Sequence, residues 1–309
     1  MDASQRTAYG ETLVKLGAEN KDIVVLEADL GKSTMGSLFE AAYPNRFYEM
    51  GIAEANMASV AAGLSLTGKI PFFASFAVFC PGRCYDQIRT SICISNLNVK
   101  VCGSSAGLSD YGDGSTHQSI DDLSLMKGLP NMQVFSPVDA VETAKIVEYM
   151  VKTPGPMFMR LNRNPVPVLT DERDAFVPGD VKLMKEGGDA AVFATGIMVS
   201  IALTAAEELE KEGIKISVVN VPSIKPINKA QVLEIAGKVK GIVTAEEHSI
   251  FGGLGDVIAD VIGENCPKKQ VRVGISDKFG SSASNYQVLL ESYGLTPKDI
   301  IEAVKKAKA

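Results

Sequence analysis

Residues 189–221, DAAVFATGIMVSIALTAAEELEKEGIKISVVNV, carry the clearest structural pattern of the chain. The stretch opens with a short apolar run, continues with apolar residues at helical spacing as far as EELEKEG, and closes on the β-branched run KISVVNV. This order predicts a strand, a helix and a second strand parallel to the first. The long apolar part contains Thr, Gly and Ser and runs into charged residues, which favours strand, turn and helix over a membrane span.

The same alternation extends outward to both ends of the chain. Strands are expected within residues 22–30, 70–76, 98–105, 155–161, 241–248 and 271–276. Helices are expected within residues 7–19, 51–68, 84–94, 139–152 and 296–309, with Asp139 and Thr296 as N-caps. Because strands and helices alternate, the sequence predicts an α/β fold of mostly parallel sheets flanked by helices.

The segment NRNPVPVLTDERDAFVPGD, at residues 162–180, interrupts this alternation. It carries three prolines and many charges without periodicity, which is typical of a linker. We therefore predict two domains, at residues 1–165 and 186–309, joined by a linker at 166–185. The length of 309 residues is sufficient for two ordinary domains.

Composition narrows the range of partners and compartments. The net charge of −6, without a dense run of Lys and Arg, argues against a nucleic-acid-binding surface. The first residues, MDASQRTAYGETL, contain no apolar signal sequence, so we expect a soluble, cytoplasmic protein without a membrane anchor. The five cysteines form no CxxC pair, which favours reduced thiols over a zinc site.

Candidate chemistry is expected just after the strands, because ligands of parallel sheets bind beyond the carboxyl ends of the strands. Glu54 is the only charged residue between Glu49 and Lys69, and it opens a helix of small apolar residues. Two interpretations remain open for its carboxylate. It interacts with the helix dipole in a structural role, or it is a buried acid that exchanges a proton with a ligand.

Three further motifs also have a structural and a functional interpretation. YGDGSTHQSID, at residues 111–121, fits neither a Walker loop nor a dinucleotide fingerprint, so its GDG alone indicates a turn. The phenylalanines of FFASFAVF, at 72–79, are core residues or a stacking platform for a flat heterocycle. Arg160 and Arg163 are solvated or grip a phosphate. We interpret His248 as a structural or interface residue.

Taken together, the motifs MGIAEANM, FFASFAVF, GLSDYGDGSTHQ and FMRLNRN resemble the pyrimidine-binding domain of the transketolase family. AEEHSIFGGLG and DKFGSSASNYQVLLESYGLT are similar to its C-terminal domain, so the resemblance covers essentially the whole chain. It implies a transferase that moves a two-carbon ketol unit from a ketose phosphate to an aldose phosphate. The family binds thiamine diphosphate between this pyrimidine domain and a separate diphosphate-binding domain.

That diphosphate-binding domain is absent from this sequence. The resemblance therefore implies the C-terminal subunit of a split transketolase, active only with an N-terminal partner subunit. The partner would hold the diphosphate and Mg²⁺ or Ca²⁺, while this chain would hold no metal of its own. A two-plus-two assembly is expected, because the family's sites lie at interfaces between dimerised domains.

The resemblance also assigns roles at the cofactor. Glu54 matches the glutamate that hydrogen-bonds N1′ of the aminopyrimidine and relays its proton. Phe79 matches the aromatic residue that stacks on this ring, and Phe76 lies nearby. Asp29 and Leu30 match residues that line the cofactor near the subunit interface.

A second group of residues matches positions that contact the sugar. His117 matches the histidine that faces the donor ketose, and Asp113 matches the aspartate that binds the acceptor's C2 hydroxyl. Arg6, Ser33 and Arg163 match positions that hold the sugar phosphate, and Arg160 is a neighbouring candidate.

The sequence departs from the family in two places. FCPGRCYDQ carries a one-residue insertion, which leaves open whether Tyr85 contacts a ligand. Gly103–Ser105 stand where transketolases carry a further phosphate-binding histidine, and GLSDYGDG is two residues longer. The alternatives are a deoxyxylulose-phosphate synthase, a β subunit of a 2-oxoacid dehydrogenase, and a non-catalytic regulatory paralogue.

Overall fold

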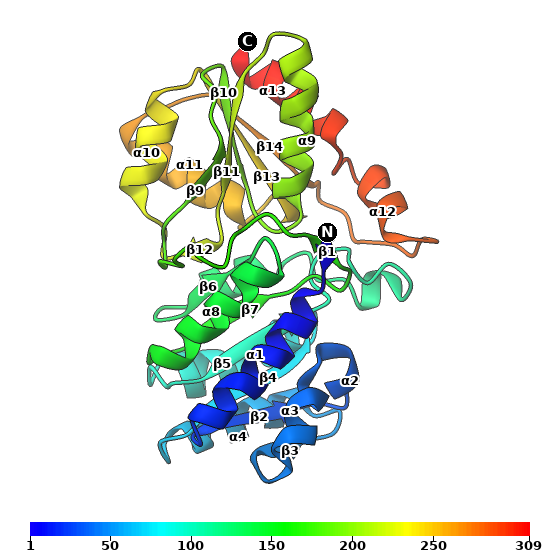
Figure 1. The fold of residues 1–309 in the computed structure, drawn as a ribbon, viewed down its shortest axis with the longest axis vertical. Helices are drawn as coiled ribbons and strands as arrows, with labels where there is room; N and C mark the ends of the chain where they lie inside the picture. Colours follow the sequence, from blue (N-terminus) through cyan, green and yellow to red (C-terminus); the bar gives the residue numbers. More distant parts are fainter.

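The computed structural model describes residues 1–309. It shows two α/β parts, one above the other in Figure 1. The lower part, drawn blue to green, is built around a seven-stranded sheet, and the upper part around a five-stranded sheet. The strands of the first part are β1 (Asp2–Ala3), β2 (Ile23–Glu27), β3 (Phe47–Glu49), β4 (Ile70–Phe76), β5 (Lys100–Ser104), β6 (Gln133–Phe135), β7 (Met157–Arg160) and β8 (Val166–Pro167). Its helices are α1 (Gln5–Glu19), α2 (Gly31–Thr34), α3 (Gly36–Ala42), α4 (Glu54–Ser65), α5 (Cys80–Arg83), α6 (Tyr85–Gln87), α7 (Asp122–Lys127) and α8 (Ala140–Lys152).

The second part follows the pattern read from residues 189–221. Its strands are β9 (Lys182–Lys185), β10 (Ala190–Ala194), β11 (Ile216–Asn220), β12 (Ser223–Lys225), β13 (Gly241–Ser249) and β14 (Gln270–Ile275). Its helices are α9 (Met198–Lys211), α10 (Lys229–Gly237), α11 (Leu254–Asn265), α12 (Tyr286–Ser292) and α13 (Pro297–Lys308). β10, α9 and β11 form the predicted unit, and β10 and β11 pair in parallel, with Ala190 opposite Ile216.

Each of the two large sheets is parallel except at one edge, and β1 and β8 form a separate antiparallel pair. The first has the order β12-β6-β7-β5-β4-β2-β3, and only β12 runs antiparallel. The second has the order β14-β13-β10-β11-β9, and only β9 runs antiparallel. The predicted α/β fold of mostly parallel sheets is confirmed.

Alternate residues of each central strand pack on opposite faces of the sheet, which fixes the helix layers. In β2, Ile23 and Val25 join a core cluster with α1 and α8, whereas Val24 and Leu26 join a cluster with α4. Figure 1 shows α1 and α8 together in front of the sheet. In the second part, α9 and α13 cover one face and α10 and α11 the other.

Local signals in the sequence explain several helix boundaries. The Asp139 side chain accepts a hydrogen bond from the N–H of Glu142, and Thr296 forms a capping box with Asp299, so both predicted N-caps are present. The helix predicted within 84–94 is divided into α6 and a π-helical segment, Ile88–Cys93. No helix is long and apolar enough to cross a membrane.

The two parts are joined by more than the segment between them. β12 leaves the second part and pairs with β6 of the first sheet, with Ser223 opposite Phe135. The residues predicted as a linker contain β8, which pairs with β1, and β9, which pairs with β11. The domain boundaries 1–165, 166–185 and 186–309 stay a prediction, since short strands stand at both ends of this segment.

Candidate active site

A pocket of about 330 Å³ opens beyond the carboxyl ends of the first sheet. Ala28 follows β2, Glu54 begins α4 after β3, Phe79 follows β4, and His117 lies in the loop after β5. Parallel strands bring these four segments to one edge, as expected for a ligand site of such a sheet. The pocket is lined by Ala28, Asp29, Leu30, Ile52, Glu54, Phe79, Arg83, Thr116 and His117.

Glu54 is the buried acid of this pocket. It is the first residue of α4, and its side chain is only 5% exposed although it lines the pocket. Oε1 accepts a bond of 2.6 Å from Nη1 of Arg83, whose side chain is half exposed. The Arg83 guanidinium carbon also lies 3.9 Å from the centre of the Phe79 ring. The planar guanidinium of Arg83 therefore contacts both the Glu54 carboxylate and the Phe79 ring.

Three aromatic rings form one wall of the site. Phe76 and Phe79 stack with ring centres 6.0 Å apart and planes at 16°. His117 meets Phe79 edge-on, with ring centres 5.3 Å apart, and meets Phe76 at 6.2 Å. Nδ1 of His117 lies 2.9 Å from the hydroxyl of Thr116, which leaves Nε2 as the ring nitrogen available to a ligand.

The predicted anion-binding residues gather beside this wall. Arg6 donates hydrogen bonds to the backbone carbonyls of Ser33, at 2.5 Å, and Arg163, at 2.6 Å. The Arg163 guanidinium lies 5.8 Å from the centre of the Phe76 ring. It forms an ion pair of 2.6 Å with Asp110, a carboxylate that is only 2% exposed. Burial and the nearby Arg163 lower the pKa of Arg6.

The YGDGSTHQSID loop is fixed by the second domain. Gly114 has φ of +76°, and a Cβ there would lie 2.4 Å from the hydroxyl oxygen of Ser282, so this position requires glycine. The side-chain amide of Gln118 donates to the carbonyls of Asp110 and Ser281, each at 3.0 Å. Asp113, in contrast, is exposed at the surface of the loop.

Arg160 lies apart from these residues. Its side chain is 6% exposed and forms an ion pair of 2.9 Å with Asp122, which is fully buried. Its Nη atoms donate to the carbonyl of Glu247 in the second domain at 3.2 and 3.3 Å. Its predicted contact with a sugar phosphate gains no support from this position, because the guanidinium is already engaged between the domains.

His248 lies in the same interdomain cluster. Its Nδ1 donates to the carbonyl of Ser249 at 2.8 Å, and its Nε2 accepts from the N–H of Ser124 at 3.4 Å. Burial lowers the pKa of His248 to about 3, so the ring is neutral. The structural or interface interpretation of this histidine therefore agrees with its contacts.

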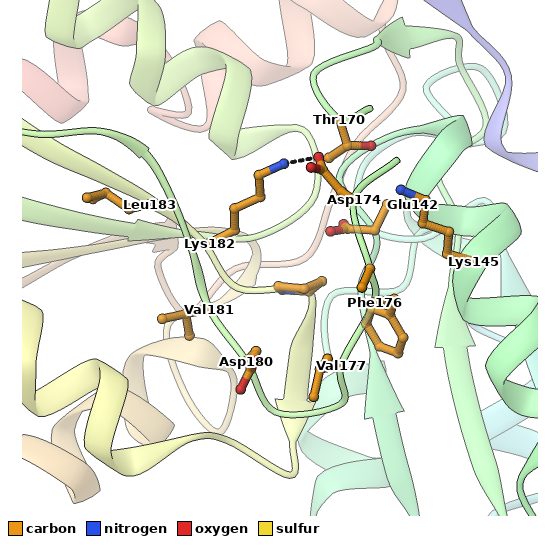
Figure 2. A pocket seen from close by; sticks show the side chains of 12 residues that line it. Glu142, Lys145, Thr170, Asp174, Phe176, Val177, Asp180, Val181, Lys182 and Leu183 are labelled. Atoms are coloured by element: carbon orange, nitrogen blue, oxygen red, sulfur yellow. Dashed lines mark hydrogen bonds and ion pairs between the residues drawn. The ribbon is translucent and has the colours of Figure 1, made fainter. Parts of the chain in front are cut away.

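A second hollow, of about 340 Å³, lies between α8, the segment before β9, and β9 itself (Figure 2). Lys182 is bonded to Asp174 across it, and the buried carboxylate of Glu142 lines its wall. None of the predicted site residues lines this hollow. We therefore place the candidate site at Glu54 and Phe79, where the predicted residues converge.

The sequence analysis overlooked two charged residues of the site. Arg83 stands four positions after Phe79, which places both on one side of a helical turn, and this spacing could have revealed it. Asp110 is an acid in the loop that follows β5, where ligand contacts are expected. Tyr85, whose contact with a ligand was left open, packs against the core cluster of α4 and does not line the pocket.

Comparison with known proteins agrees with this geometry. Residues 2–168 match the transketolase pyrimidine-binding domain, and residues 179–300 match the transketolase C-terminal domain. The chain belongs to the transketolase family. The resemblance predicted from the motifs is confirmed, and with it a subunit of the split kind.

Several transketolase relatives are about the same length as this chain. The 6-deoxy-6-sulfo-D-fructose transketolase subunit SqwH of Clostridium sp. strain MSTE9 is 42% identical over 96% of this chain and 92% of its own. An apulose-4-phosphate transketolase subunit of Actinobacillus succinogenes is 34% identical over 91% of each chain. A solved structure described as a split gene transketolase, inactive beta4 tetramer, is 47% identical with a TM-score of 0.90, and covers 100% of this chain and 99% of its own.

Proposed function

We propose that this chain is the C-terminal subunit of a thiamine-diphosphate-dependent transketolase, which transfers a two-carbon ketol unit between anionic sugars together with a separate subunit. The observation that carries the proposal is the convergence of Glu54, Phe79 and His117 on one pocket. A buried carboxylate, an aromatic platform and an imidazole are the groups that this chemistry requires from the pyrimidine domain.

The pocket suits the aminopyrimidine of the cofactor. The Arg83 guanidinium is planar and donates to Glu54 while it covers the Phe79 ring, so a planar ring with a hydrogen-bonding nitrogen can occupy the same place. When bound, thiamine diphosphate supplies the carbon nucleophile of the reaction. Glu54 would hold the proton shared with the ring nitrogen, and its burial keeps water from competing for that proton. Asp29 and Leu30 would line the edge of the cofactor.

The remaining predicted residues suit the sugar. His117 would hydrogen-bond the donor through Nε2, because its Nδ1 is occupied by Thr116. Arg6 and Arg163 would hold the anionic end of the sugar beside Ser33, as a pair of cations linked through a carbonyl. Asp113, exposed on the same loop, would contact the acceptor's hydroxyl once the partner encloses the site.

The diphosphate and its metal ion would be held by the partner. No group of three or more His, Cys, Asp or Glu side chains is arranged to hold a metal ion within this chain. Relatives of the same length are named as subunits, which supports a second polypeptide and an assembly of both kinds of chain. One of these relatives is named for a sulfo sugar and the other for a sugar phosphate, which supports an anionic sugar as the substrate class.

Reconstitution tests the proposal directly. The chain alone should bind thiamine diphosphate poorly and show no turnover. Mixed with a diphosphate-domain polypeptide and Mg²⁺, it should transfer a ketol unit from a ketose to an aldose phosphate. Full activity of this chain alone would refute the split assembly. Consumption of pyruvate without ketol transfer would favour a synthase or dehydrogenase, and cofactor binding without any turnover would favour a regulatory paralogue.

Substitution of one aromatic side chain in each place tests whether the cofactor binds at this site or in the hollow of Figure 2. Phe79→Ala should weaken thiamine diphosphate binding to the assembled enzyme about tenfold, roughly the value of one aromatic stacking contact. Phe176→Ala, which removes an aromatic ring from the second hollow, is the matched control and should leave the affinity unchanged. The reverse result would move the cofactor site to the second hollow.

A further inference from the structure

The anion-binding residues contain an acid that the proposed function does not use. Asp110 is 2% exposed and bonds Nη1 of Arg163 at 2.6 Å. Arg6 lies close enough for Asp110 to raise its pKa, against the larger lowering by burial and by Arg163. Asp110 is therefore paired with Arg163, and Arg6 joins the same cluster through its bond to the Arg163 carbonyl, so the three side chains together carry a net charge of +1.

Arg163 keeps donors for a ligand, because its side chain is 35% exposed and only Nη1 is used in the bond to Asp110. Arg6 contributes its charge, since its Nη atoms donate to backbone carbonyls and its Nε is buried. The backbone around the pair is fixed, because Gln118 donates to the Asp110 carbonyl and the hydroxyl of Ser109 accepts from the N–H of Arg163, and the Asp110 carboxylate itself is buried. A bound anion would therefore meet the arginines and the Asp110 charge at the same time.

The charge of the ligand decides how well it fits such a cluster. A phosphate monoester carries about −1.5 to −2 near pH 7, whereas a sulfonate carries one negative charge. One negative charge balances the cluster, but a second is left beside a buried carboxylate, where water screens repulsion poorly. Asp113, three residues further along the same loop, adds to this repulsion.

We propose that Asp110 is a specificity-determining residue, which directs this subunit toward sugars whose terminal group is a single negative charge, such as a sulfonate, and away from dianionic phosphates. The inference rests on the proposed function, because it assumes that Arg6 and Arg163 hold the end of the sugar. Asp110 acts on the substrate's terminal group and takes no part in the proton transfers at Glu54.

Two donors with one carbon skeleton test the inference: fructose 6-phosphate and 6-deoxy-6-sulfofructose. In the assembled enzyme, Asp110→Asn should raise the ratio of kcat/KM for phosphate over sulfonate about tenfold, since it removes a charge that opposes the second phosphate charge. Asp121→Asn, an exposed acid outside the cluster, should leave the ratio unchanged. An unchanged ratio in Asp110→Asn, or equal losses for both donors, would overturn the inference and make Asp110 a positioning residue for Arg163.

The wild-type enzyme gives a second readout that does not depend on the folding of a variant. Between about pH 5.5 and 8 the phosphate gains its second charge while the sulfonate stays unchanged. The phosphate-to-sulfonate ratio of kcat/KM should therefore fall as the pH rises, and a rising ratio would overturn the inference. The enzyme's own charged groups near the ligand are Arg6, Arg163, Asp110, Asp113 and His117. Their effect on the reacting end of the sugar is common to both donors, whereas their effect on the terminal group depends on its charge. Absence of turnover with either donor would instead refute the proposed function, and the inference with it.

Discussion

Two arginine–carboxylate pairs stand in opposite settings in this molecule. Glu54 and Arg83 are 2.6 Å apart in the open pocket, and Asp122 and Arg160 are 2.9 Å apart between the domains. Both carboxylates are buried, but the Arg83 side chain is 50% exposed and the Arg160 side chain only 6%. The exposure of the cation distinguishes the two pairs.

This difference separates a replaceable ion pair from a structural one. Arg160 also donates to the carbonyl of Glu247, so removing either partner would leave a charge buried without compensation. Arg83 can swing into water, and a ligand that bonds Glu54 and covers Phe79 can take its place. Glu54, with an exposed partner, is thus available for chemistry, whereas Asp122 is committed to a buried cation that also bonds the second domain.

The largest effect is expected when Glu54 of the half-exposed Glu54–Arg83 pair is substituted. Glu54→Gln should lower kcat of the assembled enzyme by about 10²–10⁴, because the side chain can no longer exchange a proton. The unfolding free energy should change by less than about 1 kcal/mol, since Arg83 remains solvated. Steady-state kinetics and denaturant unfolding of the same preparation measure both. A kcat within a few-fold of the wild type would remove Glu54 from the chemistry.

Substitution in the buried Asp122–Arg160 pair should instead lower the stability of the fold. Asp122→Asn should lower the unfolding free energy by about 3 kcal/mol, because the Arg160 charge stays buried without its partner. Asp171→Asn breaks an Asp–Arg pair whose arginine is 89% exposed, and this matched control should leave the unfolding free energy nearly unchanged. Denaturant unfolding compares the two. Equal losses would show that burial of the cation does not distinguish the pairs.

Glu142 is a third buried carboxylate, and it has no paired cation. It extends the comparison to the pH dependence of stability. Burial raises the pKa of Glu142 from 4.5 to about 7, so the folded protein binds this proton more tightly than the unfolded chain. Its contribution to stability is complete below about pH 4.5 and is lost as the pH rises to about 7. The difference in unfolding free energy between the wild type and Glu142→Gln should therefore fall by about 2 kcal/mol over that window. A difference that is constant with pH would contradict the raised pKa.

The smallest effect is expected from the exposed cation itself. Arg83→Met should tighten thiamine diphosphate binding to the assembled enzyme about fivefold, roughly 1 kcal/mol, because the cofactor no longer displaces a guanidinium from Glu54. A titration with Mg²⁺ present gives the dissociation constant, and Arg89→Met, an exposed arginine outside the pocket, is the control. Weaker binding in Arg83→Met would instead show that Arg83 positions Glu54 for the cofactor.

The amino-acid sequence alone was enough to predict the architecture and the main candidates of the site. Apolar runs separated by amphipathic helices predicted β2, β4, β5, β7, β10, β11, β13 and β14, because their signal is local and periodic. Short edge strands such as β3 and β12 were not predicted, since three residues carry too little pattern. The resemblance of the motifs to the transketolase family also assigned Glu54, Phe79 and His117 to one predicted site.

Which charges face a ligand and which face each other became clear only in three dimensions. Arg160 and Arg163 are three residues apart and were both candidates for the sugar phosphate, yet one lies between the domains and the other beside the aromatic wall. Arg83 and Asp110 entered the site only through contacts with residues 29 and 53 positions away. The physical reason is that the energy of a charge depends on its burial and its partners, and distant segments of the chain supply both.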